Sequence, residues 1–329
     1  MNCRVLTTPS RTKVFFLLLM QAFLLYLFIQ YSLNPELTET SVEDGSDHRP
    51  LMVDKSTIPP TAKPLAILAS ERRVRFIKEY CSKSKEEVIR TYPYFLDYLQ
   101  TLLNWIWMVS PKHHLFYCAT PKSGSTTWKS YIMEDLKINW TGLDTHDAAT
   151  SYIGSLEVYN EINLTTVEFL ETYRPENRFL FVRNPWARLA SAYDDKIKDK
   201  KWKLKNLCIG WEIYQNVKKV TFEQFIDCIL ERPERLLYQP HTHPVSSLCA
   251  VCHMDYNVIL KLEELDEAEA FLKKTLNFTI TPDYKPPRKL KNNAYKENYK
   301  NISEVQLERL QHVYRYDIEL FGFPKSPFD

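Results

Sequence analysis

The chain has 329 residues, of which 44% are hydrophobic and 13% aromatic. This is enough for one sizeable core, with residues left over for an anchor and a linker. The formal net charge is only +2, which excludes a global electrostatic attraction to nucleic acid. Only six residues are glycine, so Gly124, inside a polar turn, is a position where a special backbone conformation is expected.

Residues 14–33 form an apolar run, VFFLLLMQAFLLYLFIQYSL, with basic residues before it and acidic residues after it. A helix of about twenty residues spans the roughly 30 Å hydrocarbon layer. The charge bias predicts a cytoplasmic tail at 1–13, a transmembrane signal anchor at 14–33 and a lumenal remainder. The alternative is a cleaved signal peptide. The run is longer than the roughly 7–15 residues of a signal core, and no small-x-small site follows it.

Residues 34–65 are rich in Pro, Thr, Ser, Glu and Asp, which predicts a flexible lumenal stem. Residues 66–329 are expected to form one lumenal domain, helical over 66–108. Six cysteines beyond the anchor favour disulfides in an oxidising compartment; Cys249-x-x-Cys252 leaves zinc or a redox dithiol as alternatives. Four Asn-x-Ser/Thr sequons support a lumenal domain as glycosylation sites: Asn139, Asn163, Asn277 and Asn301.

From residue 115 onward, short apolar runs alternate with helical patterns. Helices are expected at 128–136, from Pro185, at 268–276 and up to about 320, and capping boxes begin at Thr221 and Ser303. Strands are expected at 115–119, 179–182 and 258–262. The alternation predicts an α/β fold, a P-loop-like three-layer sandwich with a central parallel sheet, preceded by one transmembrane helix.

The segment after the first strand, 120–128, reads TPKSGSTTW. Ligands of such sheets bind beyond the carboxyl ends of the strands, and a helix N-terminus there offers N–H donors to an anion. Lys122 adds a mobile charge and Gly124 permits close backbone approach. Hydroxyl groups come from Ser123, Ser125, Thr126 and Thr127. The loop predicts a cradle for a phosphate or a phosphosulfate, with a plain surface turn as the alternative.

This loop is not a Walker loop, because its lysine precedes its only glycine instead of following the second one. No acidic partner for Mg²⁺ is evident on a strand, and a nucleotide kinase needs one. The pattern therefore points away from phosphoryl transfer.

A second cluster follows the next strand and reads RNPWARLASAYDDK over 183–196. Arg183 ends the strand, so it is expected in the same crevice. Arg188 and Ser191 are three residues apart and share a helix face. Together these side chains suit a second, separate phosphate.

The two segments resemble the cofactor motifs of sulfotransferases that use 3′-phosphoadenosine 5′-phosphosulfate, most closely those of the Golgi carbohydrate group that includes the chondroitin and dermatan 4-O-sulfotransferases. The similarity covers about 110–329 and includes 241–256, Glu263 and 316–322. The group usually has Trp where Thr242 stands and Pro where Val251 stands, and often Asn where Thr127 stands.

The resemblance implies a glycan O-sulfotransferase of the Golgi membrane that needs no metal. Lys122 would neutralise the bridging oxygen as the sulfuryl group leaves, with the 5′-phosphate held by Pro121 and residues 122–127. Arg183, Arg188 and Ser191 would hold the 3′-phosphate. The implied acceptor is a glycosaminoglycan such as chondroitin, or a glycoprotein glycan.

Sulfuryl transfer also needs a base for the acceptor hydroxyl. His146 is the first candidate, because relatives often carry a histidine after the first βα unit. A solvent-facing role is the alternative for His146, and Glu157, Glu161, His241 and His243 stay open as bases. A lysine run suits an anionic acceptor or is simply a solvated face: Lys196, Lys198, Lys200, Lys201, Lys203 and Lys205.

Two other functions remain at this point. One is a lumenal kinase or nucleotide hydrolase that uses the same cradle, and the other is a catalytically silent, membrane-anchored glycan binder. The sequence does not name the acceptor sugar, the hydroxyl group or the oligomeric state.

Overall fold

The computed structural model describes residues 63–90, 105–154, 176–198, 219–231, 239–281, 284 and 295–329. Contacts divide the chain into Met1–Ile58 and Pro59–Asp329, and every described residue belongs to the second unit. The anchor predicted at 14–33 and nearly all of the predicted stem lie outside the described residues. Within the described ranges, no helix is long and apolar enough to cross a membrane.

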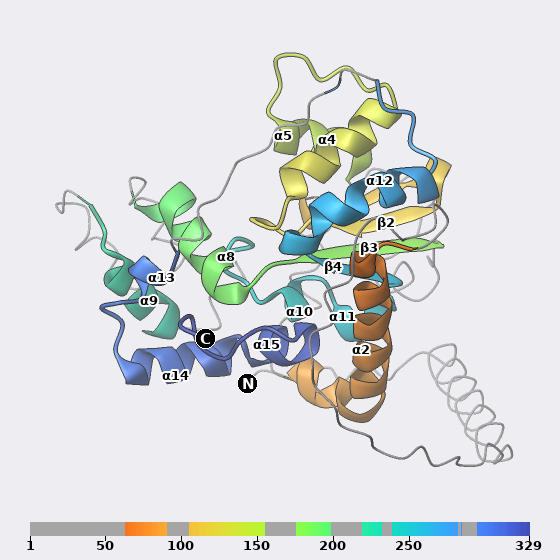
Figure 1. Cartoon of the computed structure of the whole chain (residues 1–329). Helices are drawn as coiled ribbons and strands as arrows, with labels where there is room; N and C mark the ends of the chain where they lie inside the picture. The colour runs from red at the N-terminus through yellow and green to blue at the C-terminus, as the bar shows by residue number, and fades with distance from the viewer. Residues whose placement is uncertain are drawn as a thin grey trace, which may run out of the picture. The chain divides into compact units, whose positions relative to one another are not determined.

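The centre of the fold is a four-stranded sheet with the order β1-β2-β3-β4 (Figure 1). The three predicted runs form parallel neighbours: β2 (Leu115–Cys118), β3 (Asn177–Val182) and β4 (Val258–Lys261).

The edge strand β1 (Trp107–Ser110) runs antiparallel to β2. The expectation of a helix through 108 and of an entirely parallel sheet is wrong at this edge. Only the 3-10 turn Pro111–His113 and the left-handed His114 (φ 45°) connect the two strands. Such a short connection permits antiparallel pairing, whereas a parallel pair needs a long crossover.

Both faces of the sheet are buried, and alternate side chains of each strand enter different cores. Phe116, Leu180 and Ile259 pack on one side with α2 (Leu65–Arg90), α10 (Val245–Leu248), α11 (Val251–Met254) and α15 (Arg315–Phe321). Tyr117, Phe179 and Leu260 pack on the other side with α4 (Ser125–Asp135), α5 (Thr145–Ile153) and α12 (Leu265–Thr275). Figure 1 shows these two helical layers above and below the sheet.

A further core lies beyond the sheet, where α8 (Pro185–Ala192) packs with α9 (Phe222–Glu231), α13 (Tyr295–Asn298) and α14 (Glu304–Val313). Both predicted capping boxes are present. In the first, Gln224 N donates to Thr221 Oγ1 and Thr221 N donates to Gln224 Oε1. In the second, Gln306 N donates to Ser303 Oγ and Ser303 N donates to Gln306 Oε1.

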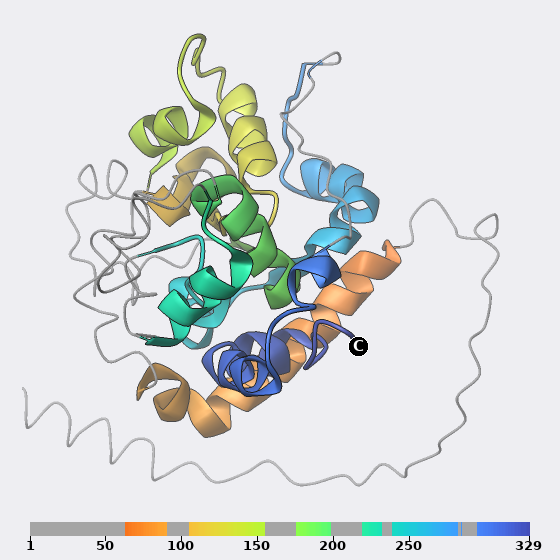
Figure 2. The same cartoon turned by 90° about the vertical axis from the view of Figure 1, so that its left-hand side faces the viewer.

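The predicted last helix is two helices, because Tyr314 leaves the helical conformation (φ −101°, ψ 16°). Its buried hydroxyl donates to Thr242 O at 2.7 Å, which ties the break to the segment before α10. The following helix, α15, lies beside α2 (Figure 2).

Two disulfides join distant parts of the domain: Cys118–Cys249 and Cys81–Cys252. Cys228 is also disulfide-bonded, whereas Cys208 lies outside the described residues. The prediction of structural disulfides is confirmed for these cysteines. Cys249 and Cys252 are each bonded elsewhere, so the Cys-x-x-Cys pair is neither an internal dithiol nor a pair of zinc thiolates.

Candidate functional site

The predicted cradle lies where β2 leads into α4. β2 ends at Cys118, and α4 begins at Ser125 with Gly124 as its N-cap. Cys118 is level with Leu180 of the adjacent parallel strand β3, so Arg183 leaves the sheet at the same edge. Topology thus brings together two motifs about sixty residues apart in sequence.

The loop backbone turns through two left-handed residues, Lys122 (φ 68°) and Gly124 (φ 85°). A Cβ on Gly124 would lie 3.3 Å from the Cδ1 atoms of Leu262 and Leu265, so both conformation and space favour glycine. The Ser123 hydroxyl is buried without a hydrogen-bond partner among the described residues. An anionic ligand bound at this helix N-terminus would give the buried hydroxyl a hydrogen-bond acceptor.

Arg183 is 8% exposed, and its guanidinium donates to Lys122 O at 3.2 Å. Burial lowers its pKa to about 10, against the opposing effect of Glu263, so Arg183 remains a cation at neutral pH. Ser191 is half-buried on α8, the helix that follows this strand. Arg183 therefore contacts the loop, whereas a phosphate contact by either residue stays a prediction.

Arg188 is 1% exposed and has a different environment. Its guanidinium donates to three backbone carbonyls, those of Pro121, Pro240 and His243, at 2.8–3.1 Å. Arg188 thus braces the loop against the segment before α10. Direct cofactor contact by Arg188 stays a prediction.

The loop lysine is engaged by a residue that sequence reasoning missed. Lys122 Nζ lies 2.8 Å from Asp195 Oδ2, and Lys196 Nζ lies 3.4 Å from the same oxygen. Asp195 belongs to a π-helical turn, Tyr193–Ile197, that continues α8. The sequence pattern did not predict this π-helical turn.

His146 lies beside the first turn of α4. Its Nε2 is 3.2 Å from Thr126 Oγ1 and its Nδ1 is 3.5 Å from Lys129 Nζ. Lys129 is buried and donates to Trp105 O at 2.9 Å, and burial lowers its pKa to about 8. The ammonium group of Lys129 makes Nδ1 an acceptor, so Nε2 carries the proton. Lys129 was also missed, although it lies three residues after Thr126 on the same helix face.

The other candidate bases have different surroundings. His241 Nδ1 donates to Gln239 Oε1 at 3.1 Å, and the positive charges of Lys196 and Lys122 lie near this ring. His243 is fully buried, with Nε2 2.9 Å from Ser247 Oγ. Glu157 and Glu161 lie outside the described residues.

Acid is expected to destabilise the protein through His146 and His241. Burial first, and then nearby lysines, lower their pKa values from 6.5 to about 4 and about 3. Unfolded histidines bind protons near pH 6.5 and the folded ones do not, so stability is full above that pH and is lost as pH falls toward 4. Melting temperatures between pH 7 and 4.5 should show a smaller decrease in His146→Gln and His241→Gln. The exposed His312→Gln is the control; a decrease unchanged in all three variants would contradict this assignment.

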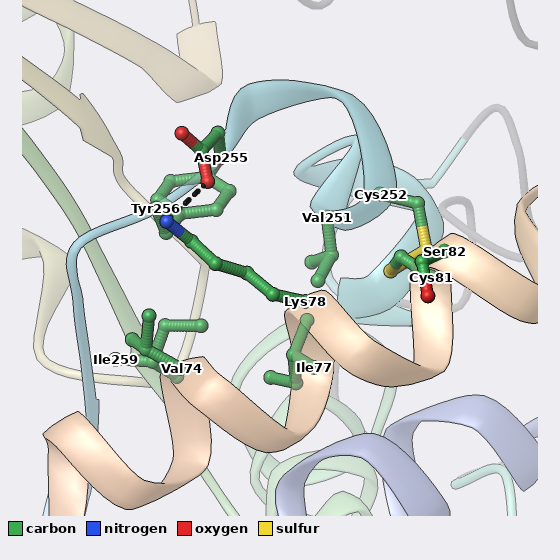
Figure 3. Close-up of a pocket in the computed structure, with 10 residues that line it drawn as sticks. All are labelled: Val74, Ile77, Lys78, Cys81, Ser82, Val251, Cys252, Asp255, Tyr256 and Ile259. Atoms are coloured by element: carbon green, nitrogen blue, oxygen red, sulfur yellow. Dashed lines mark ion pairs between the residues drawn. A yellow bond between two sulfur atoms is a disulfide. The ribbon is translucent and has the colours of Figure 1, made fainter. Parts of the chain in front are cut away.

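A pocket lies elsewhere, between α2 and α11 (Figure 3). The ion pair between Lys78 Nζ and Asp255 Oδ1, 2.8 Å apart, lines it, as does the Cys81–Cys252 disulfide. None of the predicted cofactor residues lines it, so it is separate from the candidate site.

The geometry defines a class of protein: an α/β domain in which a hydroxyl-rich loop and a buried arginine meet at the carboxyl ends of adjacent parallel strands. The unpaired Ser123 hydroxyl and the buried Arg183 cation fit an anionic ligand at this edge of the sheet.

The chain belongs to the sulfotransferase family, whose model matches residues 105–324. That range contains both motifs and most of the described domain.

Several curated relatives are carbohydrate sulfotransferases. "Carbohydrate sulfotransferase 11" of Rattus norvegicus is 26% identical over 66% of this chain and 66% of its own length. "Carbohydrate sulfotransferase 12" of Mus musculus is 28% identical, over 66% of this chain and 60% of the relative. "Carbohydrate sulfotransferase 10" of Rattus norvegicus is 26% identical over 78% of this chain and 76% of the relative. The chain thus spans just under two thirds of the length of the first of these, and no solved structure gives a significant match.

Proposed function

We propose that the protein is a carbohydrate O-sulfotransferase that transfers a sulfuryl group from 3′-phosphoadenosine 5′-phosphosulfate to a hydroxyl group of a glycan. The observation that carries this proposal is the convergence of the Lys122 loop and Arg183 at one edge of the sheet. Two anion sites suit a donor with separate 3′ and 5′ phosphates. The carbohydrate sulfotransferases among the relatives support the same reaction.

When bound, the donor supplies the sulfuryl group and an anionic leaving group. The N–H groups at the start of α4, with the hydroxyls of 123–127, would hold the 5′-phosphate. Arg183 and Ser191 would hold the 3′-phosphate. Lys122 would donate a proton or hydrogen bond to the bridging oxygen as charge develops there. Preorganised charge and alignment would supply most of the rate for an in-line transfer, and no metal is invoked.

His146 is our proposed base for the acceptor hydroxyl. Its lowered pKa keeps the imidazole neutral, which is the form that accepts a proton. With the proton on Nε2, the lone pair that can accept a proton is on Nδ1, so base catalysis requires Lys129 to leave Nδ1 when the acceptor binds.

We propose a glycosaminoglycan such as chondroitin as the acceptor. Lys196 and Lys198 lie in and just after the π-helical turn beside the cradle, so an anionic sugar chain would meet positive charge there. The remaining lysines of the run, at 200–205, lie outside the described residues.

The two alternative functions are not favoured. The relatives described above are named as carbohydrate sulfotransferases, which supports sulfuryl transfer over phosphoryl transfer or silent binding.

We also propose a Golgi membrane location, with a single-pass type II topology and the catalytic domain in the lumen. The apolar run at 14–33 and the disulfides support it. Asn139, Asn277 and Asn301 are exposed and so accessible to glycosylation, whereas Asn163 lies outside the described residues. Glycosidase-sensitive mass on these three asparagines, together with protection from protease in sealed vesicles, would test the topology.

The decisive test of function is transfer of radiolabelled sulfate from the donor to a panel of desulfated glycosaminoglycans and N-glycans, followed by disaccharide analysis. We expect incorporation into at least one glycan, with turnover that persists in EDTA. No incorporation into any glycan, or turnover that requires Mg²⁺, would contradict the proposal.

Replacing Arg183 with alanine is expected to raise the KM for the donor about 10–150-fold, because one charged contact worth about 1.5–3 kcal/mol is lost. Steady-state kinetics with varied donor would measure it. Arg178→Ala is a matched control, because Arg178 belongs to the same strand but its guanidinium binds Asp255 at the other end. An unchanged donor KM in Arg183→Ala would refute the 3′-phosphate assignment.

A further inference from the structure

We infer that Asp195 is a positioning residue that holds Lys122 in the donor-free protein, and that Lys122 exchanges Asp195 for the donor on binding. This inference rests on the proposed function, because it assigns Lys122 an anionic partner in the cradle.

The ion pair itself is well placed for such a role. Lys122 Nζ and Asp195 Oδ2 are 2.8 Å apart, and the side chains are only 11% and 27% exposed. A short pair shielded from solvent is screened less than a surface pair, so it sets the direction of the lysine side chain. Because the pair joins residues 73 apart in sequence, it also links the loop to the end of α8.

The backbone at this site explains why Asp195, and not its neighbour, faces the lysine. α8 passes into the π-helical turn, in which Lys198 N donates to Tyr193 O at 3.0 Å. Tyr193 is anchored through its hydroxyl, which donates to Val220 O at 2.6 Å. Asp194 is exposed and lies 3.5 Å from Lys198 instead. The extra residue of a π turn changes the direction of the following side chains, and such turns are frequent at functional sites.

The side chain of Lys122 can change partner on donor binding, whereas its backbone is held in place. Its backbone holds the left-handed conformation (φ 68°), and its carbonyl accepts from Arg183. A donor phosphosulfate beside the lysine would place a second anion next to the Asp195 carboxylate, and like charges at that range repel. Lys196, 3.4 Å from Asp195 Oδ2, is in position to keep the carboxylate when Lys122 leaves it. The wild-type pair therefore lowers donor affinity, and it holds the Lys122 ammonium group beside the π-helical turn until the donor arrives.

The first test measures binding of 3′-phosphoadenosine 5′-phosphate to the full chain by calorimetry. Asp195→Asn should bind this nucleotide about 10-fold more tightly, because no charged hydrogen bond has to be exchanged. Asp194→Asn carries the same change in net charge one residue away, and its affinity should change less than about 2-fold. The KM for the donor should fall in Asp195→Asn only. Equal effects of the two variants, or weaker binding by Asp195→Asn, would overturn the inference.

The second test separates exchange from a merely structural role. Asp195→Asn should lower the melting temperature of the free protein, and this deficit should disappear when the nucleotide is saturating, because the pair exists only without ligand. Asp195→Glu should restore wild-type affinity. A deficit that is equal with and without nucleotide would overturn the inference while leaving the proposed function intact. Failure of the wild-type protein to bind the nucleotide at all would overturn both.

Discussion

Replacing Lys122 with alanine is expected to lower kcat about 10²–10³-fold or more, with the fold unchanged. In the proposed mechanism, the ammonium group of Lys122 stabilises the negative charge that develops on the leaving oxygen. Its loss removes stabilisation that matters in the transition state more than in the ground state, so kcat should fall more than donor binding weakens. Sulfate transfer with saturating donor and acceptor would measure the effect.

Lys83→Ala is a suitable control for this variant, since Lys83 is an exposed lysine of α2 that pairs with Glu79 and has no part in the proposed site. It should retain most of the wild-type activity. Circular dichroism and thermal melting should show both variants folded. Sulfate incorporation unchanged in Lys122→Ala would refute the mechanism, whichever glycan is used.

Removing the Cys118–Cys249 disulfide is expected to lower the free energy of unfolding by about 2–5 kcal/mol. The two cysteines are 131 residues apart and completely buried, so the bond constrains a long stretch of unfolded chain. Cys118 is also the last residue of β2, directly before the cradle loop. Cys118→Ala with Cys249→Ala should therefore both destabilise the protein and raise the donor KM. Denaturant unfolding and donor kinetics would measure the two effects.

The other disulfide provides a control for the second effect. Cys81–Cys252 joins α2 to α11 and borders the separate pocket, away from the cradle. Cys81→Ala with Cys252→Ala should lower stability by a similar amount and leave the donor KM nearly unchanged. A donor KM that rises equally in both double variants would show that the Cys118–Cys249 bond has no special role at the loop.

The errors of sequence reasoning have local causes. Trp107–Ser110 begins inside the helix expected over 66–108, and nothing in this short segment distinguishes a buried edge strand from a helix end. The bracing role of Arg188 was not predicted either, whereas its contact with the cofactor stays a prediction. Its three carbonyl partners come from residues 52–67 positions away, and a helix pattern contains no information about them.

By itself, the sequence determined the features that depend on neighbouring residues. These are the three parallel strands, the two capping boxes, the helix that begins at Pro185 and the glycine turn before α4, since each follows from local conformational preferences and short-range hydrogen bonds. The resemblance of its two motifs also indicated the family that the match over 105–324 confirmed.

Only the tertiary structure decided which distant groups meet. The pairing of Cys118 with Cys249, of Lys122 with Asp195, and of His146 with Thr126 and Lys129 depends on how strands and helices pack. The physical reason is that burial and Coulomb interactions depend on how close two groups lie in the folded protein, and not on how far apart they are along the chain.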